Sequence, residues 1–153
     1  MPSNAPDIRL ALPREARQIA AMSRDCIEHG LGWSWNTPRV LRAMRNPATN
    51  VAVILKRDVL RGFGIMDYGD QDAHLALLAV DPTQRHLGLG AALLGWLEQS
   101  ARVAGLTAIR LEARADNRAA IAFYQHLGFT ESGTVTGYYE GVIDAVQLGK
   151  KLG

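Results

Sequence analysis

A short glycine-containing segment carries the residue types best suited to binding a phosphate. It reads Arg85-His86-Leu87-Gly88-Leu89-Gly90-Ala91 and stands between an apolar run and a helical pattern. Helix N-termini present free N–H groups that bind phosphate oxygens, and glycine lets the backbone approach them closely. Arg85 adds a permanent cation with a planar guanidinium. The segment predicts a site for a phosphate-bearing ligand; the alternative is a tight strand-to-helix turn that binds nothing.

Two familiar phosphate-binding motifs do not fit the spacing of these glycines. A P-loop needs Lys followed by Ser or Thr after its second glycine, and here Ala91-Ala92 follow Gly90. A dinucleotide fingerprint needs Gly or Ala three residues after Gly90, where Leu93 stands. One feature still favours the dinucleotide fingerprint. That motif carries a ribose-binding acid about 20 residues after its glycines, and Glu112 lies at roughly that distance here.

The elements that hold this segment follow from the spacing of apolar residues. Alternating and β-branched runs predict about seven strands, and helical spacing predicts about four helices. The strands are expected over 8–12, 51–55, 59–68, 74–80, 107–113, 129–136 and 142–148. The helices are expected over 13–28, 37–45, 89–104 and 117–127, with Thr37 capping the second.

The order of these elements, β-α-α-β-β-β-α-β-α-β-β, indicates the fold class. The strand-helix-strand unit over 74–113 places two strands in parallel, because a crossover helix returns the chain to the same edge. The short connections elsewhere make the other strands antiparallel. We therefore expect an α+β fold with a mixed, mostly antiparallel central sheet flanked by helices.

Composition indicates one globular unit. The chain has 153 residues, 48% of them apolar, with 17 Lys and Arg against 15 Asp and Glu. We expect a single domain over 1–153, with a loose tail over 1–6. The net charge of +2 is too small to indicate a nucleic-acid partner. A membrane span needs about 20 apolar residues, and the longest apolar run is only Leu75–Val80, so no membrane partner is expected.

The cysteine, histidine and arginine positions add three expectations. A lone Cys26 and the lack of a signal peptide favour a cytoplasmic protein. The four histidines do not share a metal-binding spacing, so no metal site is expected. Arg39, Arg42 and Arg45 stand three apart and would share one helix side, either as a solvated stripe or facing an acidic ligand.

Two motifs together resemble those of one known family. The segment Arg85–Gly90 is similar to the Gln/Arg-x-x-Gly-x-Gly/Ala motif of the GNAT superfamily of acyl-CoA-dependent N-acetyltransferases. The segment Asn117–Phe129 resembles a second motif of that family, in which the Asn, the Tyr and the Gly-Phe pair recur at this spacing. The resemblance covers residues 50–150 well.

Further residues resemble one branch of the family. Leu111–Arg114, Tyr138-Tyr139 and Asp144-Ala145 are similar to the protein N-terminal (ribosomal-protein alanine) acetyltransferases. Those proteins often carry Met after the Asp-Ala pair, where this chain has Val146, and segment 30–36 does not look like the peptide-acetylating type. The acceptor is therefore an amine on a small molecule or a peptide, with a peptide N-terminus, a lysine and a small amine left open.

The resemblance implies acetyl-CoA as the acyl donor and direct transfer of the acetyl group in a ternary complex. It implies that main-chain groups of Leu78, Ala79 and Val80 hold the extended arm, with an N–H near Ala79 or Val80 stabilising the oxyanion. It further implies cofactor contacts from Arg85, His86, Leu87, Gly88, Leu89, Gly90, Ala91, Asn117, Ala120, Phe123 and Tyr124. Asn117 has a second interpretation, as the cap of its helix.

The resemblance also implies the catalytic pair. Glu112 would take the amine proton through water, with a pKa raised by desolvation; the alternative is a structural ion pair with Arg110 or Arg114. Asp81 and Glu140 are lesser candidates for that base. Tyr124 would protonate the leaving thiolate; the alternative is a core aromatic.

Four aromatic residues are candidates for the acceptor side, and one other function is open. Trp33, Trp35, Tyr138 and Tyr139 would line the acceptor site, or else pack in the core. Family analogy allows a homodimer. The competing function is a non-catalytic regulatory module that binds acyl-CoA without turnover.

Overall fold

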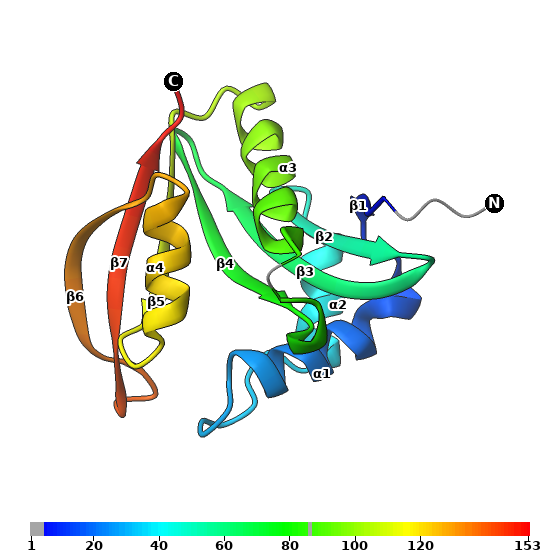
Figure 1. Ribbon diagram of the computed structural model, residues 1–153, viewed down its shortest axis with the longest axis horizontal. Helices are drawn as coiled ribbons and strands as arrows, with labels where there is room; N and C mark the ends of the chain where they lie inside the picture. Colours follow the sequence, from blue (N-terminus) through cyan, green and yellow to red (C-terminus); the bar gives the residue numbers. More distant parts are fainter. Residues whose placement is uncertain (1–4, 86) are drawn as a thin grey trace.

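The computed structural model describes residues 5–85 and 87–153, which form a seven-stranded sheet with helices on both faces (Figure 1). The strands are β1 Asp7–Leu10, β2 Thr49–Lys56, β3 Val59–Tyr68, β4 Asp72–Val80, β5 Ala108–Arg114, β6 Thr130–Tyr139 and β7 Ile143–Lys151. The helices are α1 Ala16–Cys26, α2 Thr37–Arg45, α3 Leu89–Val103 and α4 Arg118–His126. The predicted order and the α+β class are confirmed. No described helix is long and apolar enough to cross a membrane.

The sheet order is β1-β2-β3-β4-β5-β7-β6, and only the β4–β5 pair is parallel. Helix α3 makes the crossover between these two strands, as the predicted strand-helix-strand unit requires. Strand β7 then inserts between β5 and β6.

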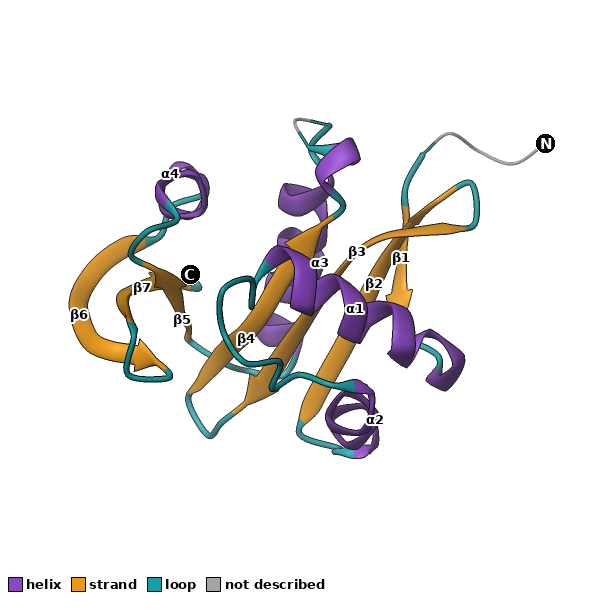
Figure 2. Ribbon diagram, turned by 90° about the horizontal axis from the view of Figure 1, so that it is seen from below, coloured by secondary structure: helices purple, strands orange, loops and turns teal. Residues whose placement is uncertain are grey.

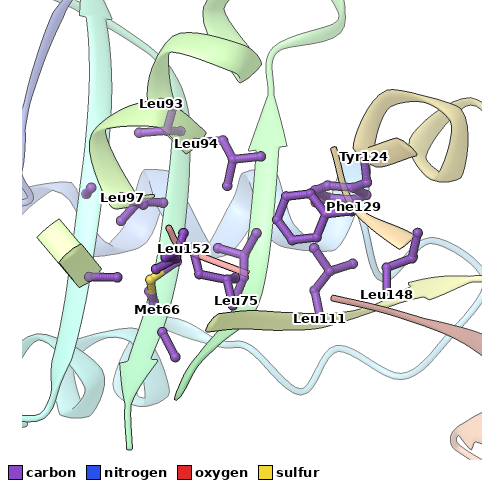
Figure 3. Close-up of a cluster of buried hydrophobic side chains, with 14 of the residues drawn as sticks. Met66, Leu75, Leu93, Leu94, Leu97, Leu111, Tyr124, Phe129, Leu148 and Leu152 are labelled. Atoms are coloured by element: carbon purple, nitrogen blue, oxygen red, sulfur yellow. The ribbon is translucent and has the colours of Figure 1, made fainter. Parts of the chain in front are cut away.

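Two apolar layers enclose the sheet from opposite faces (Figure 2). Helices α3 and α4 cover one face, where buried leucines of α3 pack on Met66 and Leu75, and Tyr124 and Phe129 extend the cluster toward β5 (Figure 3). Helices α1 and α2 cover the other face, where Ile19 and Val40 pack with side chains of β2 and β3.

Strands β4 and β5 pair over only part of their length. The parallel ladder runs from Asp72 to Leu75 and ends there, opposite Leu111. In the pairing of β4 with β3, Met66 stands opposite Leu75 and Ile65 opposite Leu77, so Ala76 is one extra residue, a β-bulge. Beyond it β4 continues along β3 while β5 continues along β7, and Figure 1 shows the two strands diverging.

The bulge exchanges the two faces of β4. Ala73 and Leu75 belong to the apolar layer under α3, whereas Leu77 and Ala79 belong to the layer under α1 and α2. Strict alternation would have kept all four residues on one face. His74, before the bulge, therefore shares the α1/α2 face with residues that follow it.

Several expected boundaries were wrong by a few residues. A 3₁₀ turn at Pro13–Glu15 precedes α1, which ends at Cys26 rather than at 28. The cap of α2 is Asn36 rather than Thr37, because Asn36 has extended backbone and its Oδ1 accepts a hydrogen bond from the Arg39 N–H at 3.1 Å.

Candidate functional site

Glu112 lies one residue beyond the end of the parallel ladder, with its side chain on the α1/α2 face. The carboxylate is only 10% exposed. Its Oε1 lies 2.6 Å from His74 Nε2 and accepts a hydrogen bond from the Tyr138 hydroxyl at 3.0 Å. Arg110 lies farther off, 3.9 Å from Oε2. Glu112 is thus a nearly buried carboxylate held by groups from β4 and β6.

The pKa of Glu112 lies below its ordinary value. The hydrogen bond with His74 is the largest cause, and Tyr138 and Arg110 act in the same direction. Burial raises the pKa of Glu112, as expected, but the hydrogen bond outweighs it. The expected net rise was therefore wrong, and Glu112 is held in its ionised form. The alternative pairing with Arg114 was also wrong, because that guanidinium binds Asp116 at 2.9 Å.

Tyr124 reaches the same part of the sheet from the opposite face. It is 8% exposed and belongs to the apolar layer under α3 and α4. Its ring meets the Phe123 ring edge to face, with centroids 5.2 Å apart, and the Phe129 ring in the same way at 5.6 Å. Figure 3 shows Tyr124 beside Phe129. Burial raises the pKa of the Tyr124 phenol far above its ordinary value, so the hydroxyl keeps its proton. The residue is a core aromatic, as one interpretation held, and also a protonated hydroxyl.

The backbone of β4 beyond the bulge has one unpaired side. The Asp81 N–H donates to Arg61 O at 2.7 Å, so Asp81 faces β3. Main-chain groups alternate in direction along a strand, so those of Ala79 also face β3 while those of Leu78 and Val80 point away from it. Within the described chain no strand pairs with that side. Leu78 and Val80 therefore suit the expected main-chain contacts, and Ala79 does not.

The glycine-containing segment begins α3 beside the end of β4. Gly88 has φ +77°, a left-handed conformation at the helix cap that favours glycine. A Cβ on Gly90 would lie 3.1 Å from the Phe123 ring and 3.7 Å from Val80, so the start of α3, helix α4 and the end of β4 meet here.

The other residues predicted to bind the ligand differ in how far they are exposed to solvent. Arg85, Leu87 and Gly88 are exposed, Ala91 and Ala120 are partly buried, and the side chain of Leu89 is buried in the core. His86 lies outside the described residues. Asn117 caps α4, its Oδ1 accepting from the Ala120 N–H at 3.1 Å, so its capping interpretation is confirmed.

The aromatic candidates divide into two groups. The Tyr138 and Tyr139 rings meet edge to face at 4.9 Å, and the Tyr139 hydroxyl donates to the Glu112 carbonyl oxygen at 3.3 Å. This pair lies directly against Glu112. Trp33 instead donates through Nε1 to Ala20 O in α1, at 3.1 Å, and Trp35 packs in the α1/α2 layer under the Arg39 guanidinium.

Three charged groups hold the loop that links α1 and α2. Glu28, 7% exposed, accepts hydrogen bonds from Ser23 Oγ, from the N–H and hydroxyl of Ser34, and from the Trp35 N–H. Arg114 donates to the carbonyl oxygens of residues 27 and 29 at 3.0 and 2.7 Å. Glu140 accepts from the residue 32 N–H at 2.7 Å. These contacts fix the loop beside the Tyr138-Tyr139 pair.

The two lesser candidates for a base already have partners. Asp81 Oδ1 accepts from the N–H and hydroxyl of Thr83, and these bonds lower the pKa of Asp81. Glu140 is the carboxylate that binds the α1–α2 loop through Gly32. Within the described part of the chain neither carboxylate bonds to Glu112 or to the groups that hold it, which leaves Glu112 as the candidate base of this site.

Sequence reasoning missed His74 and Glu28. His74 was considered only as a metal ligand. In the parallel ladder His74 stands opposite Arg110, and Glu112 follows Arg110 by two residues, so the side chains of His74 and Glu112 lie on the same face. No sequence pattern near Glu28 indicated its role, since most of its hydrogen-bond donors belong to a loop of irregular structure.

Comparison with known proteins agrees with this geometry. Residues 17–129 match the model of the Acetyltransferase (GNAT) family. The ribosomal protein bS18-alanine N-acetyltransferase of Escherichia coli is 39% identical over 90 residues, which are 57% of this chain and 61% of that enzyme. Its crystal structure has a TM-score of 0.81 at 26% identity, covering 96% of this chain and 94% of that one.

Two other solved structures are similar in fold alone. Ard1 from Thermoplasma volcanium has a TM-score of 0.85 at 24% identity, covering 97% of this chain and 98% of that chain. PaiA N-acetyltransferase from Thermoplasma acidophilum, solved in complex with coenzyme A, has a TM-score of 0.81 at 18% identity, covering 97% and 99%.

Replacing Glu28 by Ala is expected to destabilise the protein. The change leaves the fully buried Ser23 hydroxyl and the Ser34 and Trp35 N–H groups without their acceptor, and an unpaired buried donor costs about 1–3 kcal/mol. Urea unfolding of both proteins measures the loss. Asp25→Ala is the control, because that exposed carboxylate binds only its neighbour Arg24, and it should leave the unfolding midpoint nearly unchanged. Equal midpoints for Glu28→Ala and wild type would contradict the role of Glu28.

Proposed function

The chain belongs to the acetyltransferase (GNAT) family, and we propose that it is an enzyme that transfers an acetyl group from acetyl-CoA to the N-terminal amine of a peptide or protein. One observation carries the proposal. An ionised Glu112 and a protonated Tyr124 approach from opposite faces the place where β4 and β5 separate. The similarity to an enzyme named for the N-terminal alanine of a ribosomal protein favours a peptide amine over a lysine or a small amine.

The proposal extends to the whole chain and its setting. Residues 1–153 would form a single acyl-CoA N-acyltransferase domain. Because the Escherichia coli relative is named for a ribosomal protein, we infer a cytoplasmic location.

The chain offers two kinds of group for acetyl-CoA. The N-terminus of α3, with Arg85 and Gly88 beside it, suits the pyrophosphate, because free N–H groups and a fixed cation meet there. The outward main-chain groups of Leu78 and Val80 suit the amides of an extended arm, which would pair with them as a strand does. Acetyl-CoA supplies a thioester as the acyl donor.

Three groups of the chain then serve the transfer. Glu112 accepts the proton that the acceptor amine loses, directly or through one water. The Val80 N–H, pointing away from β3, donates to the thioester oxygen where negative charge develops. The Tyr124 hydroxyl gives its proton to the departing sulfur, since its raised pKa keeps that proton available at neutral pH. Holding amine and thioester together supplies a further large share of the rate.

The first test is binding followed by transfer. Calorimetry is expected to show micromolar binding of acetyl-CoA and none of NAD, and mass spectrometry to show one acetyl group added to peptides with a free N-terminus. The matched control peptide has the same sequence with a blocked N-terminus and a lysine left free. Acetylation of the blocked peptide alone would contradict the N-terminal assignment. Binding without transfer to any amine would favour the regulatory module.

Tyr124→Phe is expected to lower kcat while leaving acetyl-CoA affinity near normal. The variant loses the donor hydroxyl but keeps both edge-to-face ring contacts, and a general acid contributes roughly 10²–10⁴-fold. Tyr68→Phe is the control, because that hydroxyl binds Asn50 between β2 and β3. Steady-state kinetics and calorimetry separate the two effects. An unchanged kcat would remove Tyr124 from the role of acid.

His74→Leu is expected to move the acidic limb of the kcat/KM profile to higher pH. The lowered pKa of Glu112 keeps it ionised at neutral pH, so the wild-type rate falls only as the pH drops through that low pKa. Without the His74 hydrogen bond the largest cause of the lowered pKa is lost, so the pKa of Glu112 rises and protonation begins at higher pH. His126→Leu, at an exposed position on α4, is the control. Superimposable profiles for His74→Leu and wild type would refute this coupling.

A further inference from the structure

Helix α2 carries an unbalanced positive charge beside the site. Its sequence, Thr37 to Arg45, contains three arginines and no acidic residue. The Arg39 guanidinium lies 3.9 Å from the centroid of the Trp35 ring, which fixes its position. Arg39 also acts electrostatically on Tyr138, whose hydroxyl binds Glu112, so this cation belongs to the same side of the molecule as the candidate base.

A hollow lies between α2 and the ends of β2 and β3. Trp35, Arg39 and Arg42 line it from the helix side, and Thr49 and Asp67 line it from the strands. Arg45, at the end of the same helix, does not line it. The hollow therefore combines two guanidinium groups with one carboxylate.

A row of polar side chains joins this hollow to Glu112 on one face of the sheet. Thr49 stands opposite Asp67, and its hydroxyl donates to that carboxylate at 2.7 Å. Asp67 stands opposite His74, and His74 lies 2.6 Å from Glu112. Residues that stand opposite one another point to the same face. An acceptor whose amine reaches Glu112 can therefore continue across His74 and Asp67 toward the hollow.

The charges of the hollow favour an anionic group. Within residues 5–85 and 87–153 no carboxylate lies within ion-pair distance of Arg39 or Arg42. Asp67 already accepts the Thr49 hydroxyl, and the same hollow is lined by two guanidinium groups, so a cationic ligand would be repelled more than attracted. Arginine presents paired N–H donors that match a carboxylate.

We propose that this hollow binds a carboxylate of the acceptor peptide, so that the enzyme prefers peptides with Asp or Glu among the residues that follow the acetylated N-terminus. The inference rests on the proposed function. It assigns to Arg39 and Arg42 the choice of acceptor, and it selects the acidic-ligand interpretation of the arginine stripe over a solvated face.

Matched peptides test the inference. Each begins with the same residue, and Glu, Ala or Lys stands in turn at the second, third or fourth position. Wild type is expected to give a kcat/KM about tenfold higher for Glu than for Ala at the best position, since hydrogen bonds to charged groups are worth this much. The Lys peptide is expected to be the poorest. The ratio of Glu to Ala should fall as salt is raised, because the hollow is open to solvent.

Charge reversal on α2 supplies the matched control. Arg42→Glu, alone and with Arg39→Glu, is expected to remove the preference for Glu and to favour Lys, with a retained circular-dichroism spectrum and urea unfolding midpoint as evidence of folding. Arg45→Glu makes the same charge change on the same helix outside the hollow and should keep the preference for Glu. Equal use of all peptides by wild type, or an Arg45→Glu effect as large as that of Arg42→Glu, would overturn the inference and leave the proposed function standing. Acetylation of none would overturn both.

Discussion

A single extra residue in β4 determines where this sheet stops being continuous. Up to Leu75 the strand shares a parallel ladder with β5, and the bulge at Ala76 then leaves β4 with β3 alone. The same bulge switches the two faces of the strand, so that His74 and Leu77 face one layer although two residues stand between them. Unpaired main chain, a buried carboxylate and a buried phenol all meet at this discontinuity.

The two candidate catalytic groups owe their opposite protonation states to opposite faces of the sheet. Glu112 projects into a polar row where hydrogen bonds favour its charge, whereas Tyr124 projects into an apolar cluster that disfavours charge. Environments that push two pKa values apart define an acid and a base. A continuous sheet would keep the two faces separate, so both groups can serve one ligand only where the ladder has ended.

Local sequence pattern was enough to predict the strands and helices and the first residues of two helices. Hydrophobic spacing and the preferences of glycine and Asn act within a few residues. Gly88 and Asn117 are examples, and both cap helices as their neighbours in sequence require. The partner of Glu112 could not be found in this way, since His74 lies 38 residues away and only the parallel register of β4 with β5 brings the two side chains to the same face. The sign of the shift in the Glu112 pKa depended on that partner. Asn36 caps α2 in place of the expected Thr37, because Asn36 has the extended backbone and Thr37 is already helical.

The position of β7 has a consequence for how the molecule is made. This strand, the last in the chain, lies inside the sheet between β5 and β6. During synthesis β5 is made first, and its edge stays unpaired until β7 is made about 30 residues later. Such exposed edges favour wrong pairing. Tyr138, whose hydroxyl binds Glu112, belongs to the hairpin that β6 forms with β7. A nascent chain therefore contains α2, the start of α3 and Glu112 before it contains the tyrosine that holds the Glu112 carboxylate.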